Sequence, residues 1–188
     1  MKKKGPGTVR IIGGRWRGTR VPVPDIPGLR PSGDRSRETL FNWLQIHIRG
    51  ARCVDLFAGS GVLGLEAASR GAAEVILVEK SRQAADEIRK TVGRLEADQA
   101  DVTQSDAIAW LSACDPECMD IVFIDPPFGE GLELRALELL AAGNCVSMGG
   151  FVYLETARTG PAVAPPPGWE SIKEKTLGDV RMQLLKKV

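Results

Sequence analysis

Short apolar runs alternate with stretches of helical periodicity along the chain from residue 50 onward. The apolar runs are RCVDLFA, EVILVE, DIVFIDP and GFVYLET, and the helical stretches cover residues 61–70, 81–97, 106–113 and 131–142. Strands that alternate with helices are typical of a parallel sheet that carries helices on both faces, joined by right-handed crossovers. We expect one further strand at DVTQSD, which is short and polar at its end.

The two ends of the chain have a different pattern. Near the C-terminus, the segment WESIKEKTLGDVRMQLLKKV leaves no room for a crossover helix, because two extended runs directly flank the turn signal LGD. We therefore expect an antiparallel hairpin that closes the parallel sheet. Near the N-terminus, residues 8–24 predict a small hairpin around Gly13, Gly14 and Gly18. A helix capped by Ser36 should follow, with an apolar stripe at Leu40, Phe41, Leu44 and Ile48.

Composition is that of a soluble globular protein. At 188 residues with 43% hydrophobic side chains, the chain has the size of one compact domain with a small extension. We expect a basic N-terminal extension over residues 1–37 and an α/β domain over residues 38–188. No run approaches the roughly 18 apolar residues that a membrane helix needs, and the basic N-terminus lacks the apolar segment of a signal peptide. We therefore expect a cytoplasmic monomer with no membrane partner.

Cysteine and histidine give no sign of a disulfide, a metal site or a nucleophile. The four cysteines, at positions 53, 114, 118 and 145, follow no metal-ligand spacing, so we expect reduced thiols and no bound metal. The single histidine, His47, lies in the apolar stretch LQIHI, and we interpret it as structural.

Charge is distributed unevenly, although the net charge is only +1. Residues 1–37 carry ten Lys or Arg against two Asp, a net charge of +8, so the remaining residues together carry −7. In RIIGGRWRGTRVPVP, arginines that can bind phosphates surround Trp16, whose ring can stack on a base. The alternative is an inert solvated tail. We expect nucleic acid to contact Arg10, Arg15, Trp16, Arg17, Arg20, Arg30, Arg35 and Arg37.

Residues with functional chemistry follow four of the predicted strands. In an open parallel sheet, ligands bind beyond the carboxyl ends of the strands, at the switch in strand order. The candidates for such a site, in strand order along the chain, are Asp55 with a glycine-rich turn, Glu79, Asp106, and the segment Asp125, Pro126, Pro127 and Phe128.

The glycine-rich turn indicates a nucleoside ligand without identifying it. Gly59, Gly61 and Gly64 would let the backbone approach a ligand at the start of a helix. Glu79 lies where a carboxylate can accept both hydroxyls of a ribose, which NAD and S-adenosylmethionine share. Asp55 separates the two, because a carboxylate would repel a pyrophosphate and attract the sulfonium and amino cations of S-adenosylmethionine. S-adenosylmethionine is therefore the expected cofactor.

The segment after the fourth strand is suited to a flat ring that carries an exocyclic amine. Pro126 and Pro127 remove two amide donors and leave carbonyl groups that can accept hydrogen bonds. Asp125 adds a side-chain acceptor, and Phe128 adds a stacking face. Asp106 could accept from the adenine amino group of the cofactor, or it could act only as the N-cap of the next helix. Both interpretations of Asp106 stay open.

These motifs resemble a known class of enzymes. FAGSGVLGLE together with DPPF is similar to S-adenosylmethionine-dependent methyltransferases that act on exocyclic amines. The longer match, through RIIGGRWRG, LRPSGDRSRETLFNWL and EKTLGDV, resembles the RsmD family, which methylates the N2 amine of a guanine in bacterial 16S ribosomal RNA.

The resemblance covers nearly the whole chain and carries specific expectations. It implies a Rossmann-like class I methyltransferase fold and a guanine held by residues 125–128. It also implies that the substrate is 16S ribosomal RNA within the assembling or assembled small subunit rather than naked RNA. The cofactor site it implies comprises Asp55, Phe57, Gly59, Gly61, Glu79, Lys80 and Asp106.

Three alternative functions can be weighed against these residues. A nicotinamide oxidoreductase would need a proton-transferring side chain near its substrate, and Tyr153 inside FVYLE is badly placed for that. A non-catalytic RNA-binding protein could keep the same fold. A related methyltransferase could act on an exocyclic amine of another RNA or of DNA, or on a protein amine, because DPPF recognises an amine rather than a polymer.

Overall fold

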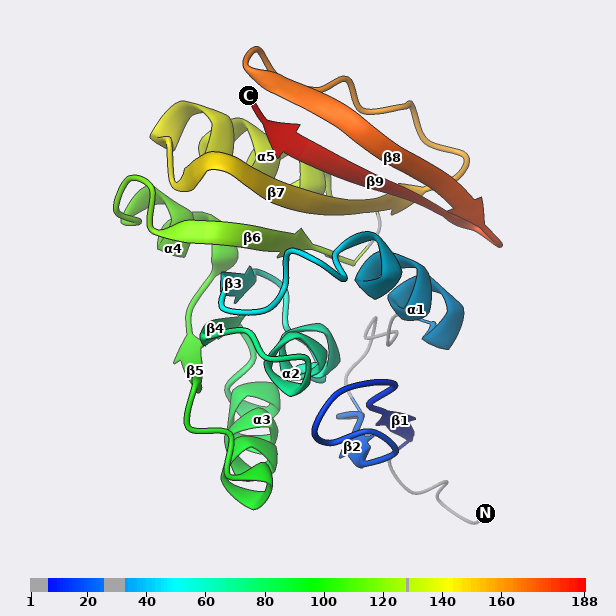
Figure 1. Ribbon diagram of the computed structural model, residues 1–188, viewed down its shortest axis with the longest axis vertical. Coiled ribbons are helices and arrows are strands. Elements are labelled where there is room, and N and C mark those ends of the chain that lie inside the picture. Colours follow the sequence, from blue (N-terminus) through cyan, green and yellow to red (C-terminus); the bar gives the residue numbers. More distant parts are fainter. Residues whose placement is uncertain (1–6, 26–32, 128) are drawn as a thin grey trace.

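A mostly parallel sheet of seven strands forms the centre of the computed structural model, which describes residues 7–25, 33–127 and 129–188 (Figure 1). The strand order is β5-β4-β3-β6-β7-β9-β8. The strands are β3 (Arg52–Asp55), β4 (Glu74–Glu79), β5 (Ala100–Gln104), β6 (Met119–Ile124), β7 (Val146–Ala157), β8 (Trp169–Leu177) and β9 (Val180–Lys187). All pairs from β5 to β7 are parallel, whereas β9 pairs antiparallel with both β7 and β8. The expected parallel sheet with an antiparallel C-terminal hairpin is confirmed.

Helices cover both faces of this sheet. In the described ranges they are α1 (Asp34–Trp43), α2 (Val62–Ser69), α3 (Arg82–Leu95), α4 (Ala107–Ser112) and α5 (Leu132–Gly143). Buried side chains of α1, α2 and α3 share one apolar cluster, and those of α4 and α5 share another. In Figure 1, α1 and α2 lie in front of the strands and α4 and α5 behind them. The four helices expected between strands are confirmed.

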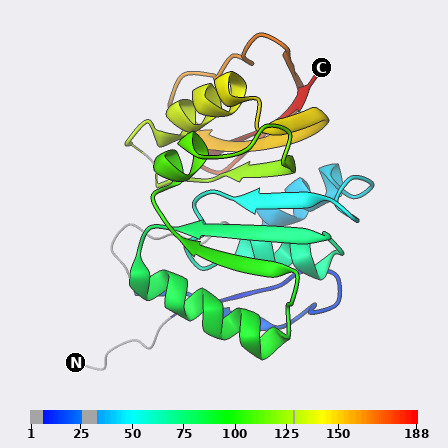
Figure 2. The same ribbon diagram turned by 90° about the vertical axis from the view of Figure 1, so that its left-hand side faces the viewer.

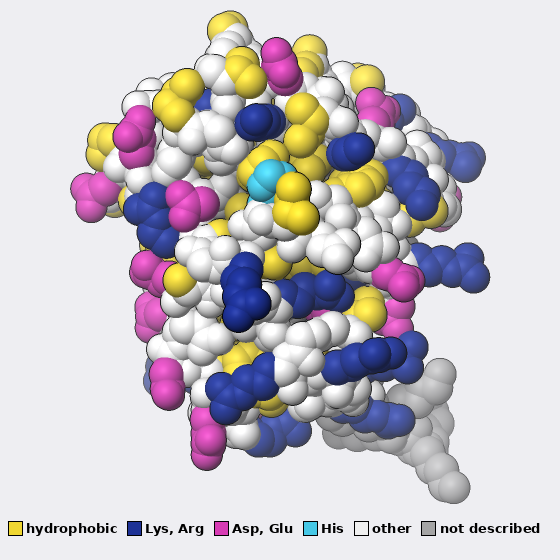
Figure 3. All heavy atoms as spheres, in the orientation of Figure 1, with side chains coloured by type: hydrophobic (Ala, Val, Ile, Leu, Met, Phe, Trp, Pro, Cys, Tyr) yellow, Lys and Arg dark blue, Asp and Glu magenta, His cyan; other side chains and the backbone are white. Residues whose placement is uncertain are grey.

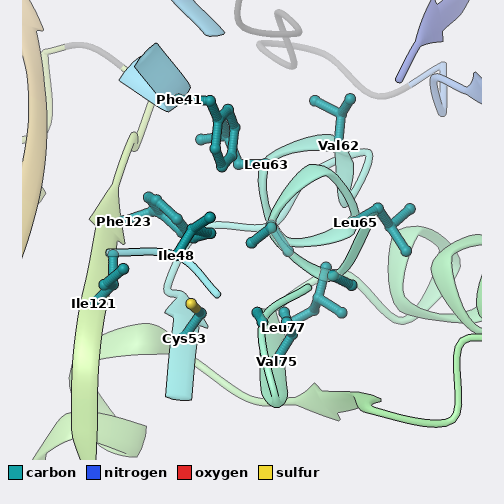
Figure 4. Packing of buried hydrophobic residues seen from close by; sticks show 14 of the residues in the cluster. Phe41, Ile48, Cys53, Val62, Leu63, Leu65, Val75, Leu77, Ile121 and Phe123 are labelled. Carbon is teal, nitrogen blue, oxygen red and sulfur yellow. The ribbon is translucent and has the colours of Figure 1, made fainter. Parts of the chain in front are cut away.

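Side chains along each central strand alternate between the two clusters. Cys53 and Phe123 belong to the cluster under α1 and α2, whereas Val54 belongs to the cluster under α4 and α5. Figure 4 shows the first cluster, in which Phe41 of α1 and Leu63 of α2 lie above Phe123. Because both faces are buried, these strands are apolar on both sides, as is usual for a parallel sheet.

The position of β3 determines where a ligand can bind. The chain passes from β3 through α2 to β4 on one side, whereas β6 pairs with β3 on the other side. Figure 2 shows these parallel strands running side by side. The strand order therefore reverses next to β3, and the carboxyl ends of β3 and β6 flank the crevice that such a reversal creates.

The expected N-terminal hairpin is present and is attached to α2. β1 (Thr8–Arg10) pairs antiparallel with β2 (Arg20–Pro22). The Arg15 amide donates to the Ser69 carbonyl oxygen at 2.8 Å. At Gly14 the φ angle is +76°, and a Cβ would come within 1.9 Å of that oxygen. The glycine therefore lets the hairpin approach the C-terminal end of α2.

The prediction that Ser36 caps a helix is wrong. α1 begins at Asp34 with Gly33 as its N-cap, and no side chain caps it, whereas Ser36 is buried inside the first turn. The boundary expected after residue 37 falls inside this helix. The extension also shares the buried cluster of α1 and α2, to which it contributes Val9, Ile11, Trp16 and Val21.

Within the described part of the chain, the hydrogen-bond and ring contacts of the cysteines and of His47 involve none of the expected site residues. All four cysteines are free thiols, and the Sγ atoms of Cys114 and Cys118 are 3.1 Å apart. The ring of His47 packs against Phe151 with centroids 4.4 Å apart, which agrees with a structural role. No helix in the described ranges has the length and apolar character that a membrane crossing requires.

Candidate active site

The carboxyl ends of β3, β4, β5 and β6 lie at one edge of the sheet, and the expected site residues lie there. Asp55 is the last residue of β3 and Glu79 the last residue of β4, while Asp106 and Asp125 follow β5 and β6. Asp55 pairs with Leu77 of β4 and with Phe123 of β6, so Glu79 and Asp125 each follow two residues beyond a direct neighbour of Asp55. The structure thus assembles candidates that are far apart in the sequence.

Two glycines shape the turn between β3 and α2. Gly59 and Gly61 have φ angles of 56° and 78°, which glycine adopts without strain. Gly61 is also the N-cap residue of α2, so the amide end of the helix faces this turn. Gly64 has a different role, because a Cβ at this position would come within 2.8 Å of Leu77. It allows α2 to pack closely on β4.

Asp55 is buried at the base of the glycine turn. The residue is 1% exposed, and its Oδ2 accepts a hydrogen bond from the Gly64 amide at 3.1 Å. Its Oδ1 is buried without a hydrogen-bond partner in the described part of the chain. Burial is the main cause that raises the pKa of Asp55 to about 7. A cationic ligand group beside Oδ1 would supply a partner and favour the ionised form.

Glu79 organises the glycine turn from the neighbouring strand. Its Oε2 accepts from the Gly59 amide and its Oε1 from the Ser81 amide, both at 2.7 Å. The residue is half-buried, and each carboxylate oxygen has a second lone pair that could accept a ribose hydroxyl. Phe57, in the turn itself, is partly buried and packs against the cluster under α4 and α5.

Asp106 is the N-cap of α4. Its Oδ1 accepts from the amides of Ile108 and Ala109 at 3.0 and 3.2 Å. Its Oδ2 lies 3.2 Å from Nζ of Lys80, which is exposed. The Ala109 amide and the Lys80 side chain lower the pKa of Asp106. The capping interpretation is confirmed, and a role toward the cofactor stays a prediction.

The chain leaves β6 through Asp125, Pro126 and Pro127. Asp125 is half-buried, Pro126 is buried and Pro127 is exposed. Neither proline has an amide hydrogen, so this segment presents carbonyl and carboxylate acceptors but no main-chain donor at the two prolines. Phe128 lies outside the described residues, and its stacking role stays a prediction.

Two buried polar residues lie near Asp125: Glu155, which sequence reasoning missed, and Tyr153, which it weighed only as a proton-transferring group of an oxidoreductase. Tyr153 and Glu155 of β7 are 0% and 3% exposed, and the tyrosine hydroxyl donates to Glu155 Oε1 at 2.5 Å. Burial is the main cause that raises the pKa of Glu155 to about 8. The signal was present in GFVYLET, where a carboxylate occupies the inward-facing position two residues after Tyr153 in an otherwise apolar strand.

Exposed arginines gather at the N-terminal hairpin and the start of α1. Figure 3 shows Lys and Arg side chains spread over the hairpin side of this face. Arg10 forms an ion pair with Asp34 at 3.3 Å. Arg30 lies outside the described residues. The expected RNA contacts that are exposed are Arg10, Arg15, Arg17, Arg20 and Arg35.

Two of the expected RNA contacts have buried side chains, and their contact with RNA stays a prediction. Trp16 is 8% exposed and belongs to the core, where the Arg15 guanidinium lies 5.5 Å from its ring centroid. Arg37 is 0% exposed, and its guanidinium contacts Asp34 at 2.6 Å and Glu66 at 3.3 Å. Both side chains are thus packed inside the protein in this structure.

Glu66 of α2 holds the arginine-bearing segment in place. It is fully buried, and its two oxygens accept from the amides of Ile12 and Gly13 at 2.7 Å each. It also pairs with Arg70 at 2.8 Å and with Arg37. The hairpin is thus connected by polar contacts to the helix that begins at the glycine turn.

A cavity of about 540 Å³ lies away from this edge, near the amino ends of β3, β4 and β6. Its lining includes Arg52, Glu74, Trp110 and Met119, and none of the expected site residues. The candidate site therefore rests on the carboxylates and the glycine turn, not on this cavity.

The fold and the carboxylate-lined glycine turn define a class I methyltransferase. A solved structure from Escherichia coli, described as a putative methyltransferase, matches the chain with a TM-score of 0.89 and 41% sequence identity. The match covers 96% of this chain and 98% of the other.

Sequence comparison identifies the family. The family model for Conserved hypothetical protein 95 matches residues 9–186. A relative from Escherichia coli named ribosomal RNA small subunit methyltransferase D is 43% identical over 187 residues, which cover 98% of this chain and 94% of the relative. A relative of the same name from Haemophilus influenzae is 41% identical and covers 95% and 93%. The chain belongs to the RsmD family of methyltransferases.

Proposed function

We propose that this protein transfers a methyl group from S-adenosylmethionine to the exocyclic N2 amine of a guanine in 16S ribosomal RNA of the small ribosomal subunit. The observation that carries the proposal is that the segment Asp125, Pro126 and Pro127 leaves β6 next to β3 and its buried Asp55 carboxyl, at the switch in strand order. The names of the relatives, which act on small-subunit ribosomal RNA, support the choice of polymer.

The residues around the glycine turn fit S-adenosylmethionine, which supplies a methyl group on a positively charged sulfur. Asp55, whose Oδ1 is buried without a described partner, would hold the cationic end of the cofactor. Glu79 would accept the ribose hydroxyls while its bonds to the Gly59 and Ser81 amides keep it oriented. Asp106 would accept from the adenine amino group. Phe57, Gly61 and Lys80 complete the proposed cofactor site.

The segment after β6 would receive the target amine. Asp125 and a carbonyl group of the proline segment accept hydrogen bonds from the amine and orient its lone pair toward the methyl group. Because the sulfur already carries a positive charge, correct positioning supplies most of what the reaction needs. After transfer, the surplus proton leaves the nitrogen to Asp125 or to water. Phe128 would stack on the guanine.

The exposed arginines of the hairpin and α1 would bind RNA phosphates around the target. A guanine in an RNA loop must be unstacked to reach the carboxyl edge of the sheet. Arginine contacts on either side of the target would stabilise that conformation. We place the protein in the cytoplasm, where bacterial ribosomes assemble, and we expect it to act as a monomer.

Methylation of defined substrates tests the proposal. Small subunits from a strain that lacks the protein should accept a labelled methyl group from S-adenosylmethionine, and mass spectrometry should locate it on N2 of one guanine. Parallel reactions with naked 16S ribosomal RNA, another RNA and DNA test the polymer. Asp125→Ala is the matched inactive control. Methylation of another RNA or of DNA in preference to small subunits would overturn the proposed substrate.

A further inference from the structure

Behind the proposed amine site lies a buried chain of three polar side chains. Tyr153 donates its hydroxyl hydrogen to Glu155 Oε1, and Glu155 lies beside Asp125, whose charge is, after burial, the next cause that raises the pKa of Glu155. The β6–β7 register explains this proximity, because Ile124 pairs with Leu154 and the next residues of the two parallel strands lie side by side. The chain therefore runs from the interior of β7 to the carboxylate that faces the target.

Two carboxyl groups can share a hydrogen bond only if one of them carries a proton, because an ionised carboxylate can only accept. Glu155 is 3% exposed, whereas Asp125 is half-buried at the edge of the sheet. Burial penalises the ionised form more strongly at Glu155, so the proton belongs there. Tyr153 cannot supply the proton between Glu155 and Asp125, because its only hydroxyl hydrogen is directed to Oε1 of Glu155.

Among the described residues, the Tyr153 hydroxyl is the group that stabilises a negative charge on Glu155, and it does so through a single hydrogen bond to Oε1. Burial is the main cause that raises the pKa of Glu155; the groups that also act on it are Asp125, directly after β6, and Tyr153 on the same strand as Glu155, and no basic group in the described residues is among them. On β9 the residue opposite is Met182, and the neighbouring Arg181 is directed to β8 and to loop carbonyl groups. The carboxyl group is therefore held neutral by burial and by the charge of Asp125.

We propose that Glu155 is a positioning residue for methyl transfer: its protonated carboxyl donates a hydrogen bond to Asp125 and fixes the Asp125 carboxylate in the orientation that receives the target amine. This inference rests on the proposed function of Asp125. Tyr153 in turn fixes Glu155 by donating to its other oxygen. If Glu155 ionises, the donor is lost and the two carboxylates repel each other.

Three variants separate this role from a merely structural one. Glu155→Ala removes the donor and should lower the single-turnover rate roughly 10- to 100-fold, since misplacement of a reacting group has costs of that size. Glu155→Gln keeps a donor toward Asp125 and an acceptor toward Tyr153, so it should recover most of the rate. Glu170→Gln, at an exposed position of β8, is the matched control and should behave as wild type.

The pH profile provides a readout that a packing role would not change. Single-turnover rates on undermodified small subunits, with saturating cofactor, are measured from about pH 6 to 9. The wild-type rate should fall as the pH rises through about 8, where Glu155 ionises. Glu155→Gln cannot ionise and should lack this alkaline decline. Should Glu155→Ala fail to fold, the comparison of Glu155→Gln with wild type decides alone.

The inference is overturned if Glu155→Gln shows the same alkaline decline as wild type. It is also overturned if a folded Glu155→Gln, with normal affinity for S-adenosylhomocysteine, is as slow as Glu155→Ala. Failure of the proposed function has a different signature, since wild-type protein would then transfer no methyl group to small subunits at any pH. If wild type is active and Glu155→Ala is equally active, the proposed function stands and only the role of Glu155 is refuted.

Discussion

Arg37 and Glu66 form an ion pair in which both side chains are fully buried, with Nη1 and Oε2 3.3 Å apart. The pair joins α1 to α2, and Glu66 also binds the main-chain amides of Ile12 and Gly13. The segment that carries the exposed arginines is thereby attached to the helix that follows the glycine turn. An RNA bound to the hairpin would thus be held by the same core that positions the glycine turn.

Arg37→Ala should lower the free energy of unfolding by about 3–5 kcal/mol, because removal of one partner leaves buried charge on Glu66 only partly compensated. Arg35→Ala is the matched control. Its side chain is exposed, so the free energy of unfolding should change by no more than about 0.5 kcal/mol. Urea denaturation measures both. A fully stable Arg37→Ala protein with weakened RNA binding would return Arg37 to the RNA-contacting residues.

Glu79→Ala should weaken binding of S-adenosylhomocysteine roughly 10- to 100-fold, because hydrogen bonds to a charged group contribute about 1.5–3 kcal/mol. The loss has two sources: the ribose loses an acceptor, and the Gly59 amide loses the partner that fixes the turn. Glu74→Ala, at the exposed start of the same strand, should leave the affinity unchanged. Titration calorimetry gives both values. Unaltered affinity of Glu79→Ala would remove this residue from the cofactor site.

Binding of S-adenosylmethionine should depend on pH through Asp55. The pKa of this carboxyl is about 7, so it is mostly neutral below that pH and ionised above it. A cationic ligand binds the ionised form, and affinity should therefore rise as the pH increases through about 7 and then level off. Asp55→Asn should bind S-adenosylmethionine more weakly at high pH, and its affinity should no longer rise as the pH increases through about 7. Calorimetry measures the affinity of wild type and of Asp55→Asn over a series of pH values. If affinity changed with pH in the same way in both proteins, contact between Asp55 and the cofactor would be contradicted.

RNA binding is best tested with exposed charges, because the hairpin cannot be deleted without removing core residues such as Ile11 and Val21. Replacing Arg15 and Arg17 with Gln should weaken binding of small subunits and reduce the salt dependence of affinity. Each lost phosphate contact should reduce the slope of log affinity against log salt concentration by roughly 0.7 to 0.9. Arg82→Gln on α3 is the control. An unchanged salt slope in the double variant would show that these arginines are only solvated.

Periodicity and turn chemistry were sufficient to predict the sheet, its helices and the two hairpins, since strands buried on both faces and glycine-marked turns have strong local signals. They also located Asp55, Glu79 and Asp125, because the carboxyl ends of parallel strands converge. Burial was not predicted where a residue type serves both in a core and in RNA contacts. Trp16 and Arg37 have the chemistry of RNA contacts, yet the fold buries them, and local sequence does not specify which face meets α2.

Glu155 was missed for the opposite reason. A carboxylate near the end of a strand looks like an ordinary surface residue until the pairing of β7 between β6 and β9 is known. That pairing covers both sides of the strand and brings Glu155 beside Asp125. Contacts of this kind depend on strand register, which short-range patterns do not encode.

Asp125 should act by orienting the amine rather than by removing its proton before transfer. Asp125→Ala should then abolish most turnover and leave affinity for S-adenosylhomocysteine nearly intact, because the reacting nitrogen loses its positioning partner. Asp125→Asn should be milder, since its side-chain oxygen still accepts the same hydrogen bond although it cannot take up a proton. Single-turnover rates on undermodified small subunits compare the two variants. If Asp125→Asn proved as inactive as Asp125→Ala, with folding and cofactor affinity preserved, the negative charge of Asp125 would be required and the orienting role would be wrong.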